Sequence, residues 1–142
     1  MENINPENDI LYLVKTLNKA LAQDFDKRLA EYDLTGQQGR LLFYINRTVN
    51  IEGNKLHQND IEKLLGLSKS TVSGLIDRLE TKELIKRVPA HPYVEIVPTK
   101  KCSNIVNHIH SNRDRAIEKL LKGFTVEEKE SIIKNIKIQI WK

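Results

Sequence analysis

This chain contains little cysteine, few aromatic residues and no long apolar run. These scarcities exclude an internal disulfide, an aromatic core and a membrane span. The single cysteine, Cys102, cannot form a disulfide within the chain, which is typical of a reducing compartment. Aromatic residues make up 6% of the sequence, so the core must be built from Ile, Leu and Val. No apolar run approaches the roughly 20 residues of a membrane span. The first residues, Met1 to Asp9, are polar and acidic, unlike a signal peptide. We therefore expect a cytoplasmic protein without a membrane segment.

Catalytic and metal-binding motifs are also missing. The sequence has no glycine-rich phosphate loop, no Gly-x-Ser-x-Gly, no His-Glu-x-x-His and no paired-cysteine motif. Its histidines do not have the spacing of metal ligands, because His108 and His110, two residues apart, face different sides of a helix. The expectation is a protein that is not an enzyme and that needs no metal or cofactor.

What the chain does have is the composition of one globular unit with a basic middle. Its 142 residues suit a single domain, and 39% of them are hydrophobic and 30% charged. The formal net charge is +4. From Lys55 to Lys101 there are nine Lys and Arg against six Asp and Glu, so most of the excess lies in the middle third. This balance permits nucleic-acid binding without establishing it.

Apolar periodicity predicts two helices in the first third of the chain. Asn5-Pro6 has the pattern of an N-cap followed by proline at the first helical position, and a long amphipathic helix should run over 5–32. Its apolar positions recur every three or four residues: Ile10, Leu13, Val14, Leu17, Leu21, Phe25 and Leu29. Thr35 and Gln38 have capping-box spacing and begin the next helix, and residues 48–56 are expected to form a loop.

The middle of the chain predicts a helix-turn-helix followed by a β-hairpin. A short helix begins near Gln58 with Ile61, Leu64 and Leu65 inward, Gly66 ends it, and Leu67 should be buried in the turn. Ser68 caps a second helix whose apolar face consists of Val72, Leu75, Ile76 and Leu79. The pattern then becomes extended in two arms, 86–90 and 94–97, around a tip of His91-Pro92-Tyr93.

The end of the chain is helical again. A helix begins near Thr99, and Thr125 with Glu128 forms a second capping-box pattern before a terminal helix rich in isoleucine, with Trp141 at its end. The terminal helices have more apolar surface than a small middle domain can cover. Such surfaces usually meet a second chain. The predicted fold is mainly α, a winged helix-turn-helix with a short β-hairpin wing and long N- and C-terminal dimerisation helices. It forms one unit over 1–142, with the winged part at 34–98 and the dimerisation helices at 5–32 and 99–142.

The second helix of the helix-turn-helix is the candidate DNA-contacting element. It opens with small hydroxyl residues and a lysine, as a helix entering the major groove requires, and its N–H groups favour a phosphate. Basic and titratable residues of the hairpin are expected to support it along the DNA backbone or in the minor groove. The candidate DNA contacts are Ser68, Lys69, Ser70, Thr71, Ser73, Arg78, Lys86, Arg87 and His91. The alternative is that Ser68 is only a helix cap and the other residues are solvated surface.

These segments resemble the MarR (multiple antibiotic resistance regulator) family of winged-helix transcription factors. The resemblance covers nearly the whole chain and is carried by Leu34-Thr35, by the run from Leu67 to Glu80, by Leu84-Ile85-Lys86-Arg87 and by Thr99. It implies a homodimer that binds double-stranded DNA at a near-palindromic operator, usually as a repressor. It further implies release by a small ligand, often phenolic and anionic, so a small aromatic or anionic effector is an expected partner.

The chain departs from the family pattern at several positions. Glu83 stands where the family commonly has glycine, and a left-handed conformation there would cost roughly 1 kcal/mol. The wing tip lacks the usual Asp-x-Arg, and Gly74 replaces a larger polar or basic residue. These differences keep open a second interpretation, a winged-helix protein-interaction module that has lost DNA binding. Cys102 is interpreted as a small residue packed at a helix start, with a redox sensor as the alternative.

Overall fold

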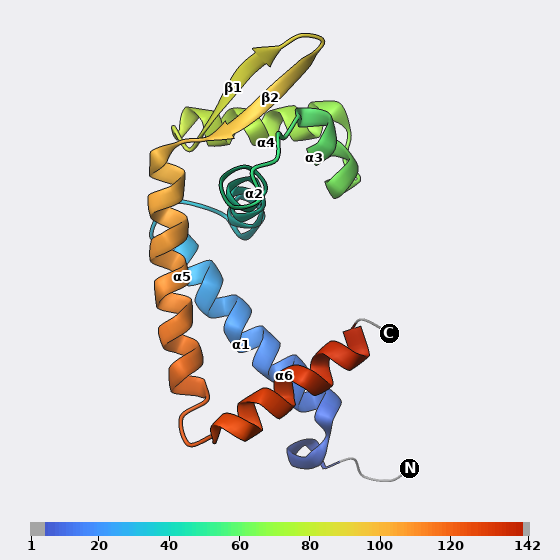
Figure 1. Ribbon diagram of the computed structural model, residues 1–142, viewed down its shortest axis with the longest axis vertical. Helices are drawn as coiled ribbons and strands as arrows, with labels where there is room; N and C mark the ends of the chain where they lie inside the picture. The colour runs from blue at the N-terminus through green and yellow to red at the C-terminus, as the bar shows by residue number, and fades with distance from the viewer. Residues whose placement is uncertain (1–4, 141–142) are drawn as a thin grey trace. The chain divides into compact units, whose positions relative to one another are not determined.

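The computed structural model describes residues 5–140 and divides the chain into two compact units, one ending at Ile109 and the other beginning at His110. We call them the winged unit and the C-terminal unit. The chain runs through the helices and strands labelled in Figure 1 and through two short helical segments, η1 and η2. Their bounds are η1 Pro6–Asn8, α1 Ile10–Ala30, α2 Gly36–Asn46, η2 Arg47–Ile51, α3 Gln58–Leu65, α4 Lys69–Thr81, β1 Ile85–Ala90, β2 Tyr93–Pro98, α5 Lys100–Leu120 and α6 Val126–Ile140. The predicted mainly helical, winged-helix fold is confirmed.

The N-terminal helix begins later than the sequence pattern predicted. Asn5 caps only a short 3-10 helix, Pro6–Asn8, in which its side chain accepts a hydrogen bond from Glu7 N–H at 3.1 Å. Asp9 is the N-cap of α1, where its carboxylate accepts from Leu11 N–H at 3.0 Å. The helix ends at Ala30 rather than near Tyr32.

The expected capping box of α2 is present. Thr35 Oγ1 accepts from Gln38 N–H at 3.2 Å, and Gln38 Oε1 accepts from Thr35 N–H at 3.0 Å. The close packing of α1 on α2 needs a glycine at position 39, because a Cβ there would lie 2.3 Å from Leu29 Cδ1. The packing of α1 against α2 thus depends on Gly39 having no side chain.

The segment 48–56 was wrongly predicted to be loop throughout. Helix continues after α2 as a π-helix over Arg47–Ile51. Asn50 Nδ2 donates to Asn46 Oδ1 at 2.8 Å and to Ser103 Oγ at 3.0 Å, which ties this turn to the first turns of α5. A π-helix turn is an uncommon feature that periodicity alone does not reveal.

One apolar core holds the winged unit together. It takes Leu29 from α1, the inner faces of α2, α3 and α4, the start of the hairpin and the first half of α5. The predicted inner face of α4 is buried throughout: Val72, Leu75, Ile76 and Leu79. Leu64 was wrongly placed inward and is 52% exposed, because α3 packs through Ile61 and Leu65. Leu67, predicted to be buried, is half-buried and packs against the core.

The hairpin is the two-stranded antiparallel sheet of the winged unit. Ile85 pairs with Pro98 at its base and Ala90 with Tyr93 at its end. The turn is therefore His91-Pro92, and Tyr93, predicted to be part of the tip, is the first residue of β2. A single bridge between His57 and Glu95 adds the segment before α3 to the other edge of β2.

The C-terminal unit comprises the end of α5, a turn and α6. The second capping box is present, since Thr125 Oγ1 accepts from Glu128 N–H at 3.1 Å and Glu128 Oε1 accepts from Thr125 N–H at 3.2 Å. No residue between 110 and 140 is buried. Trp141 lies outside the described residues. Within the described part of the chain, no helix has the length and apolar character needed to cross a membrane.

Candidate nucleic-acid interface

The first turn of α4 presents a cluster of hydroxyl groups to solvent. Ser68 Oγ accepts from Thr71 N–H at 3.3 Å and also lies 3.2 Å from Ser70 Oγ and 2.9 Å from Thr71 Oγ1. Ser68, Lys69, Ser70 and Thr71 are all exposed. A helix start with small hydroxyl groups and one cation matches the requirements of phosphate and base-edge contact.

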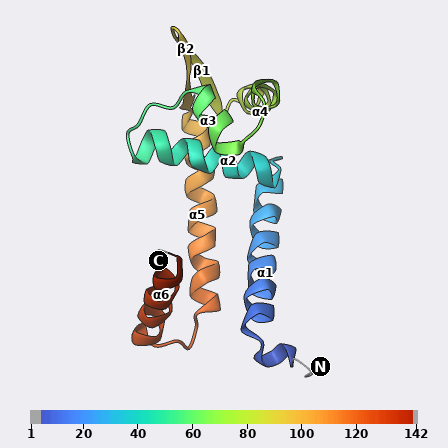
Figure 2. The same ribbon diagram turned by 90° about the vertical axis from the view of Figure 1, so that its right-hand side faces the viewer.

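The turn before α4 is set by Gly66. Its φ of 61° is left-handed, which glycine adopts without strain and which ends α3. Only three residues separate α3 from α4, and Leu67 packs against the core between them. Figure 2, in which α4 is seen end-on, shows α3 and α4 together beside the hairpin.

The outward face of α4 continues from Thr71 to Arg78. Residues seven apart lie on the same side of a helix, and Gly74 lies between them on that side. No atom lies within 4 Å of the position that a Gly74 Cβ would occupy, so the surface there is open. Neither Arg78 nor Lys86 forms an ion pair within residues 5–140, and both are exposed. Both cations are therefore free to meet phosphate or base.

Arg87 has a different environment from the one the sequence suggested. Its guanidinium reaches from β1 to α4, where Nη1 donates to Asp77 Oδ1 at 2.5 Å and to Glu80 Oε1 at 3.3 Å. Nη2 donates to Ser73 O at 3.1 Å and to Ser73 Oγ at 3.3 Å. The Arg87 N–H also donates to Glu80 Oε2 at 2.9 Å. This network fastens the wing to α4 and also engages Ser73, another candidate contact.

Sequence reasoning missed the two carboxylates of this network. Asp77 and Glu80 are three residues apart on α4 and so face the same side. Paired acids on a helix proposed to approach DNA need a cation to offset them. That requirement was the available signal for a partner such as Arg87.

The rest of the wing is built around the turn His91-Pro92, which contains no Asp, Glu, Lys or Arg. His91 lies exposed at the turn. The Tyr93 ring contacts the His57 ring, with centroids 5.2 Å apart, and His57 Nδ1 lies 3.5 Å from Asp60 Oδ2 at the start of α3. The hairpin is thus held to α4 by Arg87 and to the start of α3 by His57.

The turn from α4 to β1 contains Glu83, the residue that stands where the family commonly has glycine. Glu83 has φ 60°, so it is left-handed. Thr99 Oγ1 donates to Glu83 O at 2.7 Å, and Leu84 N–H donates to Leu79 O at 3.0 Å. These bonds hold the strained turn and connect it to the start of α5.

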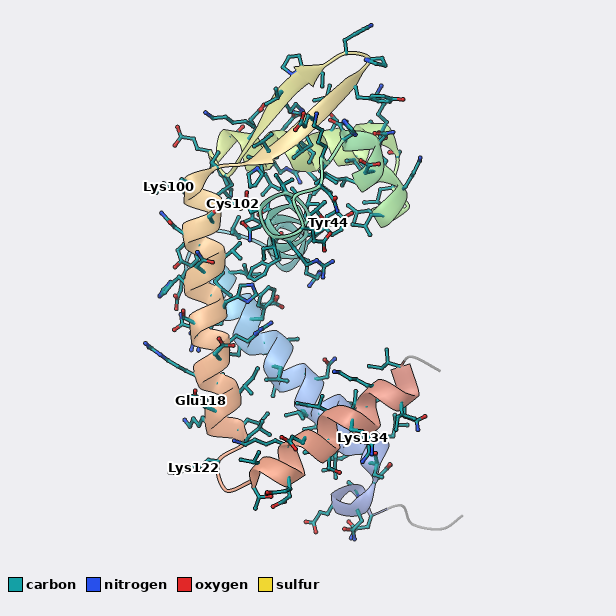
Figure 3. The ribbon with its side chains drawn as sticks, in the orientation of Figure 1. Tyr44, Lys100, Cys102, Glu118, Lys122 and Lys134 are labelled. Carbon is teal, nitrogen blue, oxygen red and sulfur yellow. The ribbon has the colours of Figure 1, made fainter. Side chains whose placement is uncertain are left out.

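Cys102 lies in the first turn of α5, as Figure 3 labels it, and its side chain is fully buried. Its N–H donates to Thr99 Oγ1 at 3.3 Å. Burial raises the pKa of its thiol to about 12. Because thiolate is the reactive form, this environment favours the packing role over the redox sensor. Residues 5–140 contain no group of three or more His, Cys, Asp or Glu that could hold a metal ion.

A helix-turn-helix whose second helix exposes its first turn, with a hairpin fastened beside it, defines the winged helix-turn-helix class of DNA-binding proteins. Comparison with known proteins agrees. The family model of the MarR family matches residues 32–91. MepR of Staphylococcus aureus, a transcription regulator of the multidrug efflux pump MepA, has a crystal structure that is 30% identical in sequence with a TM-score of 0.77. That match covers 93% of this chain and 96% of MepR.

Other relatives give a consistent result. A crystal structure of MepR with DNA is 28% identical, with a TM-score of 0.69 and coverage of 96% of this chain and 97% of that one. The uncharacterised HTH-type regulator YybA of Bacillus subtilis is 26% identical over 88% of this chain and 82% of its own length. The LexA repressor of Staphylococcus haemolyticus is 31% identical over 70% of this chain, which spans only 49% of that repressor. The chain belongs to the MarR family and is a DNA-binding transcriptional regulator.

Proposed function

We propose that the chain is a homodimeric repressor that places the first turn of α4 in the major groove of each half of a near-palindromic operator. The observation that carries this proposal is the exposed cluster of Ser68, Lys69, Ser70 and Thr71, presented at a helix start. In this assignment the hydroxyls and Lys69 contact phosphates and base edges. Arg78, on the same face as Thr71, reads a base or contacts a phosphate farther along the helix.

Lys86 and Arg87 are assigned different parts in this proposal. Lys86 is exposed and unpaired within the described residues, so it supplies charge to the DNA backbone. Arg87 is a positioning residue, because its guanidinium is engaged by Ser73, Asp77 and Glu80. It fixes the wing against α4 and offsets two carboxylates that would otherwise repel phosphate. His91 stays a candidate contact at the turn of the wing.

The dimer in this proposal is supported by apolar side chains that the single chain leaves exposed. Along α1, Ile10, Val14 and Leu17 are 78%, 57% and 43% exposed. In the C-terminal unit, Ile133 and Ile136 are 54% and 52% exposed. Such stripes are unfavourable in water, and a second copy burying the same stripes forms a symmetric interface. Two protomers then present two copies of α4 to two half-sites.

Release by a small aromatic or anionic ligand belongs to the proposal through the family alone. The described residues assign no site to such a ligand. Its test is a screen of small aromatic carboxylates against the preformed DNA complex, in which a true effector lowers DNA affinity at a saturable concentration.

The proposal is tested by fluorescence anisotropy with labelled DNA from the upstream region of the protein's own coding sequence and a random duplex of equal length, across a salt series. We expect tight binding to the upstream DNA, weaker binding to the random duplex and affinity that falls steeply with salt. Equal and weak binding to both at low salt would contradict it and favour the protein-interaction module. Repression itself is checked with a reporter gene under the same upstream DNA.

A further inference from the structure

The helices α1 and α4 end in the same backbone motif, and in both motifs the left-handed residue is not glycine. Asp33, after α1, has φ 56°, and Glu83, after α4, has φ 60°. In both turns, the N–H of the next residue donates to a carbonyl five residues earlier, at 3.0 Å. A helix end of this kind leaves other carbonyls to be satisfied by donors from outside the helix.

Two lysines supply such donors. Lys82 is the C-cap of α4, and its Nζ donates to Asp33 O and lies 3.4 Å from Asp33 Oδ2. Lys101, in the first turn of α5, donates from Nζ to Lys82 O at 3.0 Å. The C-terminus of a helix is the negative end of its dipole, so ammonium groups are favourable there. We call Asp33, Lys82 and Lys101 the lysine junction, and it joins the end of α4 to α1 and to α5.

The junction connects the DNA-contacting helix to the helices of the proposed dimer. In Figure 2 the end of α1 lies below α4. Along α1, Ile10 and Val14 are exposed and await burial by a second copy under the proposed function, and α5 continues to Leu120 toward α6. Hydrogen bonds at one end of α4 therefore restrict its direction relative to the helices that would hold the two protomers together.

We propose that Lys82 and Lys101 are positioning residues that fix α4 relative to the dimer and so determine which half-site spacing the protein accepts; this inference rests on the proposed function. One added base pair moves a half-site by about 3.4 Å and rotates it by roughly 35°. A dimer whose two copies of α4 are held at their C-terminal ends cannot follow that change. Neither lysine is assigned to DNA, because both ammonium groups donate to backbone carbonyls of another element.

The experiment measures affinity for the upstream operator and for operators lengthened or shortened by one base pair between the half-sites. Wild type should bind the altered spacings about tenfold or more weakly than the native spacing. Lys82→Met keeps the apolar stem and removes the donors. It should bind the native operator more weakly and lose only about threefold on the altered spacings. Lys101→Met should change the ratio in the same direction, and circular dichroism melts check the fold of both.

Three further variants separate positioning from charge. Lys82→Arg retains N–H donors and should restore the spacing preference. Asp33→Asn removes the exposed carboxylate but keeps the carbonyl that Lys82 bonds, and asparagine tolerates a left-handed backbone, so the preference should remain. Lys86→Met removes an exposed lysine of β1 and should weaken binding to all three operators by the same factor.

The outcomes distinguish this inference from the proposed function. A wild-type ratio between native and altered spacings in folded Lys82→Met and Lys101→Met overturns the inference and leaves the proposed function standing. If one of the two variants does not fold, the other decides alone. A wild-type chain that does not distinguish its operator from a random duplex overturns both.

Discussion

The winged unit and the C-terminal unit bury their apolar residues very differently. In the winged unit, large side chains such as Leu42, Ile61 and Ile76 are completely buried by neighbours from the same chain. In the C-terminal unit, isoleucines of comparable size stay exposed, and no residue from 110 to 140 is buried. The change occurs within α5, which is buried at Ile105 and Ile109 and exposed at Ile117 and Leu120.

This difference shows which part of the molecule buries its apolar residues without a second chain. Burial of apolar surface is the main driving force of folding, so the part of the winged unit from Leu29 to Ile109 can hold its shape alone, whereas α1 before Leu29 leaves apolar side chains exposed as the C-terminal unit does. The C-terminal unit contains the capped helix α6, yet its large apolar residues stay exposed within one chain. Under the proposed function, a unit that is well formed locally but unburied gains its stability from association with a second copy.

The largest expected effect comes from placing charge on the apolar face of α6. Ile132 and Ile136 lie on one side of the helix, four residues apart, and are 39% and 52% exposed. The double variant Ile132→Asp with Ile136→Asp should be monomeric, and operator affinity should fall by about 100-fold or more because the two half-sites are no longer linked. Sedimentation velocity and fluorescence anisotropy measure the two effects.

The matched control for α6 is Lys134→Asp, which adds the same charge two residues from Ile132 and Ile136 and therefore on the opposite side of the helix. Figure 3 labels Lys134 on α6. It should leave the dimer intact. A double isoleucine variant that sediments as wild type does would show that this face is not an interface.

The next effect concerns the outward face of α4. Arg78→Ala should weaken operator binding by about 1–3 kcal/mol if the guanidinium reads a base, with little loss on random DNA. Thermal unfolding should be unchanged because Arg78 is exposed and has no ion pair within the described residues. Parallel titrations of both duplexes measure this. An unchanged operator affinity would remove Arg78 from the interface.

A smaller effect is expected within the winged unit itself. Glu83 is left-handed, with φ 60°, so Glu83→Gly should raise the free energy of unfolding by about 1 kcal/mol. Gly66→Ala is the opposite control, since Gly66 has φ 61° and a side chain there introduces strain. Urea denaturation measures the free energy of unfolding of both variants relative to wild type. A destabilised Glu83→Gly would mean that the glutamate side chain outweighs its backbone strain.

The smallest expected change concerns Cys102. Burial raises the pKa of its thiol to about 12 in the folded protein, above the ordinary value of 9.0. Its contribution to stability is therefore complete below pH 9 and is lost as the pH rises toward 12. At pH 8, a thiol reagent should label the native chain far more slowly than the urea-unfolded chain. Peroxide should leave DNA binding unchanged, and rapid native labelling with DNA release would restore the redox-sensor alternative.

The sequence predicted most of the fold because its signals are local. Apolar periodicity located α1, α4 and α6, and the Thr35 and Thr125 capping boxes located two helix starts. Contacts between residues far apart in the sequence were harder to predict. Nothing local indicates that Asn50 meets Ser103 across a π-helix, or that Leu64 lies beyond the packed face of α3.

The candidate site was predicted in its chemistry more than in its contacts. The hydroxyl-rich start of α4 could be recognised because capping residues and small side chains are visible in the sequence. The paired acids Asp77 and Glu80 indicated that a cation is needed, but not that Arg87 supplies it, since that depends on how closely β1 lies to α4. An argument from charge alone therefore overestimated how much of the Arg87 guanidinium is available to contact DNA.

The most direct test of the central claim is the mass of the purified wild-type chain in solution without DNA. Sedimentation equilibrium at micromolar concentration should give twice the chain mass of 16.4 kDa, because a second copy would bury the apolar residues of α1 and of the C-terminal unit that one chain leaves exposed. A stable monomer of 16.4 kDa with native helix content would contradict the account, since the exposed stripes would then need no second chain.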